Sequence, residues 1–172
     1  MKQFFFNWLF LVLSGVTVAQ NKAALRFNTT GEFKIIQFTD THVNTSKGEN
    51  LGIFEYLKKI IEAEKPDLVV VTGDIVTEND PQKGYMMFVR LFQETGVPWV
   101  MVFGNHDSEH NLSRKDLAAF LQSRPGCLNK DEGETDGNSN FVLTVLGKDN
   151  KAAALLYFMD SNDYSTLKPR VG

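Results

Sequence analysis

Three segments of strand length each end in a short polar motif, and this repeated arrangement limits the fold more than any other feature of the sequence. The segments span residues 33–39, 67–72 and 97–103, and the last of them is apolar throughout, which is typical of a strand buried on both faces of a parallel sheet. Segments of helix length separate the three. The sequence therefore predicts parallel strands joined by right-handed helical crossovers.

The remaining pattern adds helices and a hairpin to this framework. Residues 53–64, 81–95 and 113–121 carry apolar side chains at helical spacing, so each is expected to pack one face on the sheet. Residues 140–146 and 152–159 flank a short polar turn and are typical of a β-hairpin. The predicted fold class is α/β, with a β-α-β-α-β half followed by a hairpin.

Side chains able to bind a metal ion or to move a proton follow all three strands. They occur in the motifs Asp40-Thr41-His42, Gly73-Asp74 and Gly104-Asn105-His106-Asp107. Ligands of parallel α/β sheets bind beyond the carboxyl ends of the strands. We therefore expect these motifs to gather along one edge of one sheet and to form one site.

Each motif also has an interpretation of its own. Asp40 and His42 are two residues apart, so on an extended chain they face the same way and can meet one cation. After a sharp turn at Gly104, His106 can hydrogen-bond a phosphoryl oxygen or pass a proton to a leaving group, while Asp107 can hold the imidazole in the required tautomer. Taken singly, each motif also fits a polar turn without any ligand.

Taken together and in this order, the three motifs resemble those of the calcineurin-like metallophosphoesterase superfamily, which includes purple acid phosphatases, Ser/Thr phosphatases and many phosphodiesterases. The strand end Asp160-Ser161 and the following Asn162-Asp163-Tyr164-Ser165 are similar to the purple acid phosphatase-like branch. The resemblance covers residues 33 to about 165 and implies a sheet sandwich flanked by helices.

The resemblance implies a centre of two divalent or trivalent metal ions, such as iron, manganese or zinc. Asp40 and His42 would bind the first ion, and Asp74 would bridge both. Asn105 would bind the second ion and touch the substrate. Two cations that share one carboxylate can hold a hydroxide at neutral pH and can neutralise the phosphoryl oxygens of a small phosphate ester.

The resemblance also assigns the catalytic side chains. His106 would contact the substrate and either protonate the leaving group or stabilise the transition state, and Asp107 would support it. The implied reaction is the hydrolysis of a phosphate ester by the hydroxide shared between the ions. Monoesters and diesters both fit this chemistry, and neither is favoured by the sequence.

Two departures from the family pattern bear on this function. Thr77 occupies the position of the tyrosine that binds ferric iron in purple acid phosphatases, so an iron–tyrosinate site is not expected. The family also completes its metal site with a lone histidine and a Gly-His-x-His motif in its second half, whereas this chain has 3 histidines, His42, His106 and His110. We therefore expect residues 33–172 to be the N-terminal portion of a longer domain. The alternative is an inactive exported fragment, or a domain that binds an anion or a partner.

The first residues of the chain predict export. Residues 1–19 combine a short basic start, an apolar stretch and small residues, as in a secretory signal peptide. Cleavage after Ala19 would leave residues 20–32 as a linker and make the protein secreted or periplasmic, with no stable membrane span. An uncleaved anchor is the alternative, although the apolar run is shorter than the ~20 residues of a membrane-spanning helix.

Charge and cysteine content limit the partners and the covalent links. The formal net charge is −3 and the basic residues form no cluster, which argues against binding to a nucleic-acid backbone. Cys127 is the single cysteine, so the chain can form no internal disulfide and its core must hold the fold. An anionic ester would need a local positive centre, which metal ions can supply.

Overall fold

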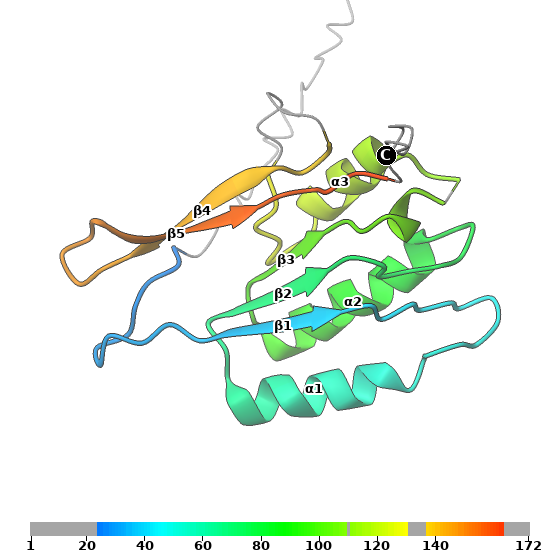
Figure 1. Cartoon of the computed structure of the whole chain (residues 1–172). Coiled ribbons are helices and arrows are strands. Elements are labelled where there is room, and N and C mark those ends of the chain that lie inside the picture. The colour runs from blue at the N-terminus through cyan, green and yellow to red at the C-terminus, as the bar shows by residue number, and fades with distance from the viewer. Residues whose placement is uncertain (1–23, 110, 131–136, 164–172) are drawn as a thin grey trace, which may run out of the picture.

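The structure, a computed structural model, describes residues 24–109, 111–130 and 137–163 (Figure 1). In chain order, its elements are β1 (Ile35–Thr39), α1 (Ile53–Glu64), β2 (Leu68–Thr72), α2 (Gln82–Thr95), β3 (Trp99–Val102), the 3₁₀ helix η1 (His106–Ser108), α3 (Arg114–Gln122), β4 (Phe141–Leu146) and β5 (Ala152–Phe158). The predicted β-α-β-α-β half with a following hairpin is confirmed. The predicted signal peptide, residues 1–19, lies outside the described residues, as does His110.

The first three strands form a parallel sheet in the order β1-β2-β3. The prediction that the third strand is buried on both faces is confirmed, since all residues of β3 are buried, and in β2 only the last residue is half-buried. β1 differs, because its residues alternate between exposed and half-buried. It is an edge strand, and among the described residues only β2 pairs with it.

Side chains of β2 and β3 alternate between two apolar layers. On one face, Trp99 of β3 stacks on Phe92 of α2 with ring centroids 5.2 Å apart, in a core shared with the helices. On the other face, Val100 packs in a second core with the hairpin, where Phe141 and Phe158 stack at 4.9 Å. The sheet therefore lies between a helical layer and the β4–β5 hairpin (Figure 1).

The segment before β1 packs on the hairpin over part of its length. Leu25 is buried, and its carbonyl accepts a hydrogen bond from the N–H of Leu146 at 2.9 Å. The N–H of Phe27 donates to the Leu146 carbonyl, also at 2.9 Å. Residues 24–28, which the sequence analysis placed in a linker, are thus attached to the end of β4. None of the helices in the described ranges has the length and apolar character needed to span a membrane.

Candidate active site

The turns after β1, β2 and β3 lie side by side because the strands end in register. Thr39 is paired with Thr72, and Thr72 with Val102. The N–H of Asp40 donates to the Gly73 carbonyl at 3.2 Å, and the N–H of Gly73 donates to the Val102 carbonyl at 2.7 Å. The parallel topology therefore brings the three polar motifs to one edge of the sheet.

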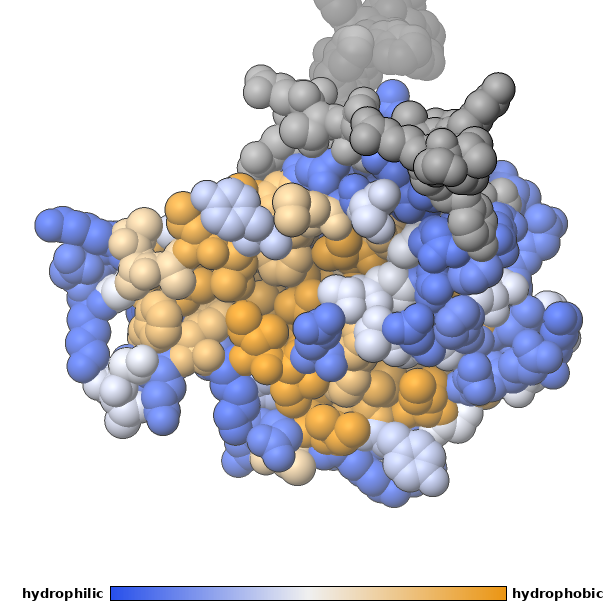
Figure 2. Space-filling model, viewed as in Figure 1, coloured by the Kyte–Doolittle hydropathy of each residue, from blue (hydrophilic) through white to orange (hydrophobic). Residues whose placement is uncertain are grey.

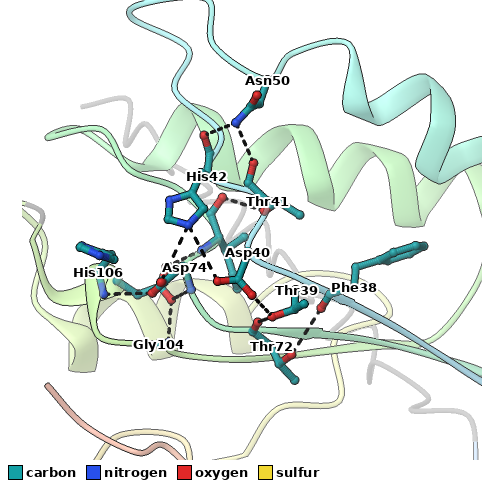
Figure 3. Close-up of polar contacts among 12 residues, drawn as sticks. Phe38, Thr39, Asp40, Thr41, His42, Asn50, Thr72, Asp74, Gly104 and His106 are labelled. Atoms are coloured by element: carbon teal, nitrogen blue, oxygen red, sulfur yellow. Dashed lines mark hydrogen bonds and ion pairs between the residues drawn. The ribbon is translucent and has the colours of Figure 1, made fainter.

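Two carboxylates and one imidazole converge at this edge (Figure 3). Nε2 of His42 lies 3.9 Å from Oδ1 of Asp40 and 3.9 Å from Oδ2 of Asp74. Within the described ranges this is the one group of three or more His, Cys, Asp or Glu side chains whose donor atoms meet, all within 4.8 Å of one another. Ligands each ~2.1 Å from one ion lie at most ~4.2 Å apart, so both 3.9 Å separations fit a shared cation. The oxygen and nitrogen donors suit zinc, manganese or iron.

The same three residues adopt left-handed backbone conformations, with φ of 52° at Asp40, 45° at His42 and 51° at Asp74. Such values are uncommon outside glycine and tend to mark functional turns. They are held by main-chain and side-chain bonds: the N–H of His42 donates to the Asp74 carbonyl at 2.9 Å, and Nδ2 of Asn50 donates to the His42 carbonyl at 3.0 Å. The Asp40–His42 pair therefore converges through a left-handed turn, and not along the extended chain that the sequence analysis assumed.

Asp74 connects the second motif to the third. Its Oδ1 accepts a hydrogen bond from the N–H of His106 at 3.0 Å, while Oδ2 faces His42. Gly104 makes this approach possible, because a Cβ there would lie 2.4 Å from Oδ1 of Asp74 and 2.8 Å from the α-carbon of Gly73. The glycine is thus required by close packing of two turns.

Asp107, which the sequence analysis assigned to the imidazole of His106, binds main-chain amides and a buried hydroxyl, and its support of His106 stays a prediction. Its carboxylate is fully buried and accepts hydrogen bonds from the N–H groups of Asp74, Ile75 and Gly104 and from the Tyr85 hydroxyl, at 2.8–3.0 Å. The physical reason is that main-chain N–H groups left over at the ends of β2 and β3 need acceptors. Asp107 therefore fastens the two turns together.

A different carboxylate pairs with His106. Nδ1 of His106 lies 2.9 Å from Oε1 of Glu109, and this hydrogen bond is the main reason why the pKa of His106 is raised above its ordinary value. The ring of His106 lies 5.9 Å from that of His42, measured between centroids. Sequence reasoning missed Glu109, although its i,i+3 spacing from His106 in a short helical turn is the signal that could have found it.

Asn105 is the N-cap of η1 and is half-buried. It precedes the amide that donates to Asp74, so the turn carries it to the same edge of the sheet. Its role as a ligand of a second ion, and the second ion itself, stay predictions. Thr77, which replaces the iron-binding tyrosine of purple acid phosphatases, is half-buried.

Tyr85 of α2 is a second residue that sequence reasoning did not connect to the site. Its side chain is fully buried and its hydroxyl donates to Oδ1 of Asp107 at 2.8 Å. Burial is the main cause that raises the pKa of Tyr85 well above its ordinary value, and the neighbouring charge of Asp107 raises it further. The sequence placed Tyr85 correctly on the buried stripe of the helix, but the pattern of apolar residues carries no information on its hydroxyl.

Comparison with known proteins gives a consistent result. The sequence matches the family model for calcineurin-like phosphoesterases over residues 33–167. A protein named "Probable inactive purple acid phosphatase 29" of Arabidopsis thaliana is 32% identical over 184 residues, covering 91% of this chain and 47% of that protein. Phosphatase DCR2 of Saccharomyces cerevisiae is 28% identical over 161 residues, covering 80% of this chain and 28% of that protein.

Over a shorter aligned stretch, the chain is also similar to a bacterial protein. A probable glycerophosphodiester phosphodiesterase, GpdQ, of Arcobacter nitrofigilis is 33% identical over 90 residues, covering 47% of this chain and 32% of that protein. The chain spans less than half the length of these relatives, with 43–47% of three Arabidopsis proteins and 28% of phosphatase DCR2 covered.

Proposed function

The chain belongs to the calcineurin-like phosphoesterase family, and from this premise we propose that its sheet-edge site serves the metal-dependent hydrolysis of small phosphate esters. The observation that carries the proposal is the convergence of Asp40, His42 and Asp74 from two separate strand ends, with the third motif hydrogen-bonded to Asp74. The metal ions would supply positive charge for phosphoryl oxygens and an activated water.

Asp74 is the residue that we assign to both ions. Its two carboxylate oxygens face different groups, Oδ1 toward the amide of His106 and Oδ2 toward His42. A carboxylate turned in this way can offer one oxygen to an ion bound with Asp40 and His42, and the other to an ion near Asn105. Its side chain is only 14% exposed, and the hydrogen bond from the His106 amide to Oδ1 favours this orientation.

His106 is the proton donor in this proposal. Its ring stands beside that of His42, at the edge where a phosphate ester would lie. Glu109 accepts the hydrogen bond of Nδ1 and so fixes the orientation of the ring. A proton from the imidazole would pass to the oxygen of the leaving alcohol as the phosphorus–oxygen bond breaks.

A matched pair of variants in the complete gene product tests this function. Asp74→Asn keeps the shape of the side chain but removes its charge. Loss of a residue that only orients a metal ligand typically costs up to about a hundredfold. Asp74 is proposed to bind the ions directly, so bound metal and the hydrolysis of an aryl phosphate should fall by at least about that factor. Asp149→Asn, in the exposed turn of the hairpin, should change neither. Metal content and turnover are measured together, and unchanged values in Asp74→Asn would refute the assignment.

An inactive domain that binds an anion or a partner is the second candidate function. Three of the relatives bear the name "probable inactive" purple acid phosphatase, which favours this candidate. If the domain is inactive, both the 172-residue chain and the complete gene product should bind metal weakly, and neither should hydrolyse a phosphate ester. Turnover by the complete product separates the two candidates.

Export is part of the proposal. The order of basic, apolar and small residues within residues 1–19 supports it. N-terminal sequencing of the mature protein should begin at Gln20, and a mature protein that retains Met1 would contradict cleavage.

A further inference from the structure

We propose that Arg114 and Asp160 act as a positioning pair that fixes the turn carrying Asn105 and His106. The inference rests on the proposed function, because it concerns the turn that supplies the second-ion ligand and the proton donor. Neither residue belongs to the three motifs that follow β1, β2 and β3. Arg114 begins α3, and Asp160 follows β5, 46 residues later.

The guanidinium of Arg114 joins three parts of the chain. Nη1 donates to Oδ1 of Asp160 at 2.7 Å, and Nη2 donates to the Gly104 carbonyl at 2.5 Å. Nη2 also lies 3.2 Å from the carbonyl of Asn162. The planar guanidinium suits this task because its donors point in fixed directions, so one bonded oxygen determines where the others must lie.

Both members of the pair are removed from solvent. The side chain of Arg114 is 9% exposed and that of Asp160 is 0% exposed. Asp160 is held in turn, since its carboxylate accepts from the N–H groups of Asn138 and Asn162 at 2.9 Å and its own N–H donates to Oδ1 of Asn140 at 2.7 Å. A buried ion pair is weak evidence for stability, and it is better explained here by the geometry that it imposes.

The geometry in question is that of Gly104. A glycine between two functional turns is the most flexible residue that the chain could place there. Its N–H donates to Oδ2 of Asp107 at 2.8 Å, and its carbonyl accepts from Arg114. Both main-chain groups of Gly104 are therefore held by buried charged side chains, and the direction in which the chain continues to Asn105 and His106 is fixed.

A purely structural reading is the competing one, in which the pair only ties α3 to the end of the hairpin. The two readings differ at the amide of His106, which donates to Oδ1 of Asp74. If Arg114 positions the turn, its removal loosens this particular hydrogen bond. If it only ties two elements, the amide responds no more than the rest of the fold.

Amide hydrogen exchange of the 172-residue chain without metal tests the proposal. In Arg114→Met the exchange of the His106 amide should accelerate by at least about tenfold relative to the Val69 amide, which donates to the Pro98 carbonyl in the core sheet. Dividing by the Val69 rate removes the effect of global destabilisation. Leu117→Val is the control, because it weakens a fully buried contact of the same helix without touching Gly104.

Equal relative exchange in Arg114→Met and Leu117→Val would overturn the positioning role. Should Arg114→Met fail to fold, Asp160→Asn replaces it, since the amide side chain keeps its size but loses the charge that holds the guanidinium. Arg114→Lys should restore only part of the protection, because an ammonium group lacks the planar pair of donors.

Zinc binding to the same samples keeps this proposal separate from the proposed function. Accelerated exchange at His106 in a chain that binds no zinc and whose complete gene product hydrolyses no ester would support the positioning role and reject the function. Zinc binding and ester hydrolysis, together with unchanged exchange at His106 in Arg114→Met and Asp160→Asn, would support the function and reject the positioning role.

Discussion

At the residue scale, Gly104 shows how one missing side chain determines the site. The α-carbon packs against Gly73, and the space where a side chain would stand is filled by the Asp74 carboxylate. Asp107 and Arg114 then bind the two main-chain groups of the glycine. The third motif can approach the second only because this position has no Cβ.

Gly104→Ala should therefore displace Asp74 and weaken the site. The added methyl group would lie 2.4 Å from Oδ1 and 2.7 Å from the N–H nitrogen of Asp74, which forces the turns apart. We expect a loss of about 1–3 kcal/mol in the free energy of unfolding, typical of overpacking, together with weaker zinc binding. Urea denaturation and calorimetry measure the two effects.

Gly52→Ala is the matched control for this substitution. Gly52 has a helical φ of −66° at the N-cap of α1, and nothing lies within 4 Å of the Cβ it would gain. Its stability and zinc affinity should stay close to those of the unmodified chain. Similar losses in both variants would show that the contact with Asp74 is not the cause.

At the scale of elements, the strands bring the motifs together and the helices hold them in place. α2 does this through Tyr85, whose hydroxyl donates a hydrogen bond to Asp107. α3 does it through Arg114, which extends from the first turn of the helix to the Gly104 carbonyl. Both helices therefore contribute a polar contact as well as an apolar face.

The buried hydrogen bond from Tyr85 of α2 to Asp107 predicts that the stability of the fold depends on pH. Burial raises the pKa of Tyr85 well above its ordinary value, whereas a tyrosine in the unfolded chain ionises near pH 10. Above about pH 10 the unfolded chain therefore loses a proton that the folded chain retains, and the free energy of unfolding must fall as the pH rises. This contribution is fully present below that pH.

Tyr85→Phe should remove this alkaline loss and should cost about 2 kcal/mol at neutral pH, since Asp107 then lacks a donor. Urea denaturation between about pH 8 and 11 measures both quantities. Tyr56→Phe is the control, because Tyr56 is 67% exposed on α1. The same slope against pH in Tyr85→Phe and in the unmodified chain would contradict the argument.

At the scale of the whole molecule, one face carries an apolar surface between β1 and the hairpin (Figure 2). Four large side chains of this face are exposed, Ile35 by 40%, Leu155 by 50%, Tyr157 by 66% and Met159 by 73%. They border a hollow of about 500 Å³. β5 is thus apolar on both of its faces, although only the inner face packs on the sheet.

This face should bind the apolar dye ANS. Leu155→Lys combined with Tyr157→Lys should reduce the dye fluorescence by at least about twofold, because both side chains border the hollow. Tyr56→Lys removes a tyrosine of equal exposure outside the hollow and should change the fluorescence little. Equal fluorescence in all three proteins would show that the surface offers no apolar binding area.

The sequence by itself determined the order of the elements and the place of the site. Its α1 prediction, residues 53–64, agrees with the helix observed, Ile53–Glu64. Apolar periodicity gave strands and helices in alternation, and parallel strands must end at the same edge of a sheet. The meeting of Asp40, His42 and Asp74 follows from that topology.

Only the tertiary structure decided which side chains hold the site. In the folded chain Asp107 accepts hydrogen bonds from main-chain amides, and His106 pairs with Glu109. Arg114 forms an ion pair with Asp160, 46 residues away in the sequence. Sequence patterns report which face of an element is apolar, because burial of apolar area depends on periodicity. A hydrogen-bond partner depends instead on which N–H and C=O groups remain unpaired where strands end, and distant segments settle that only when they pack.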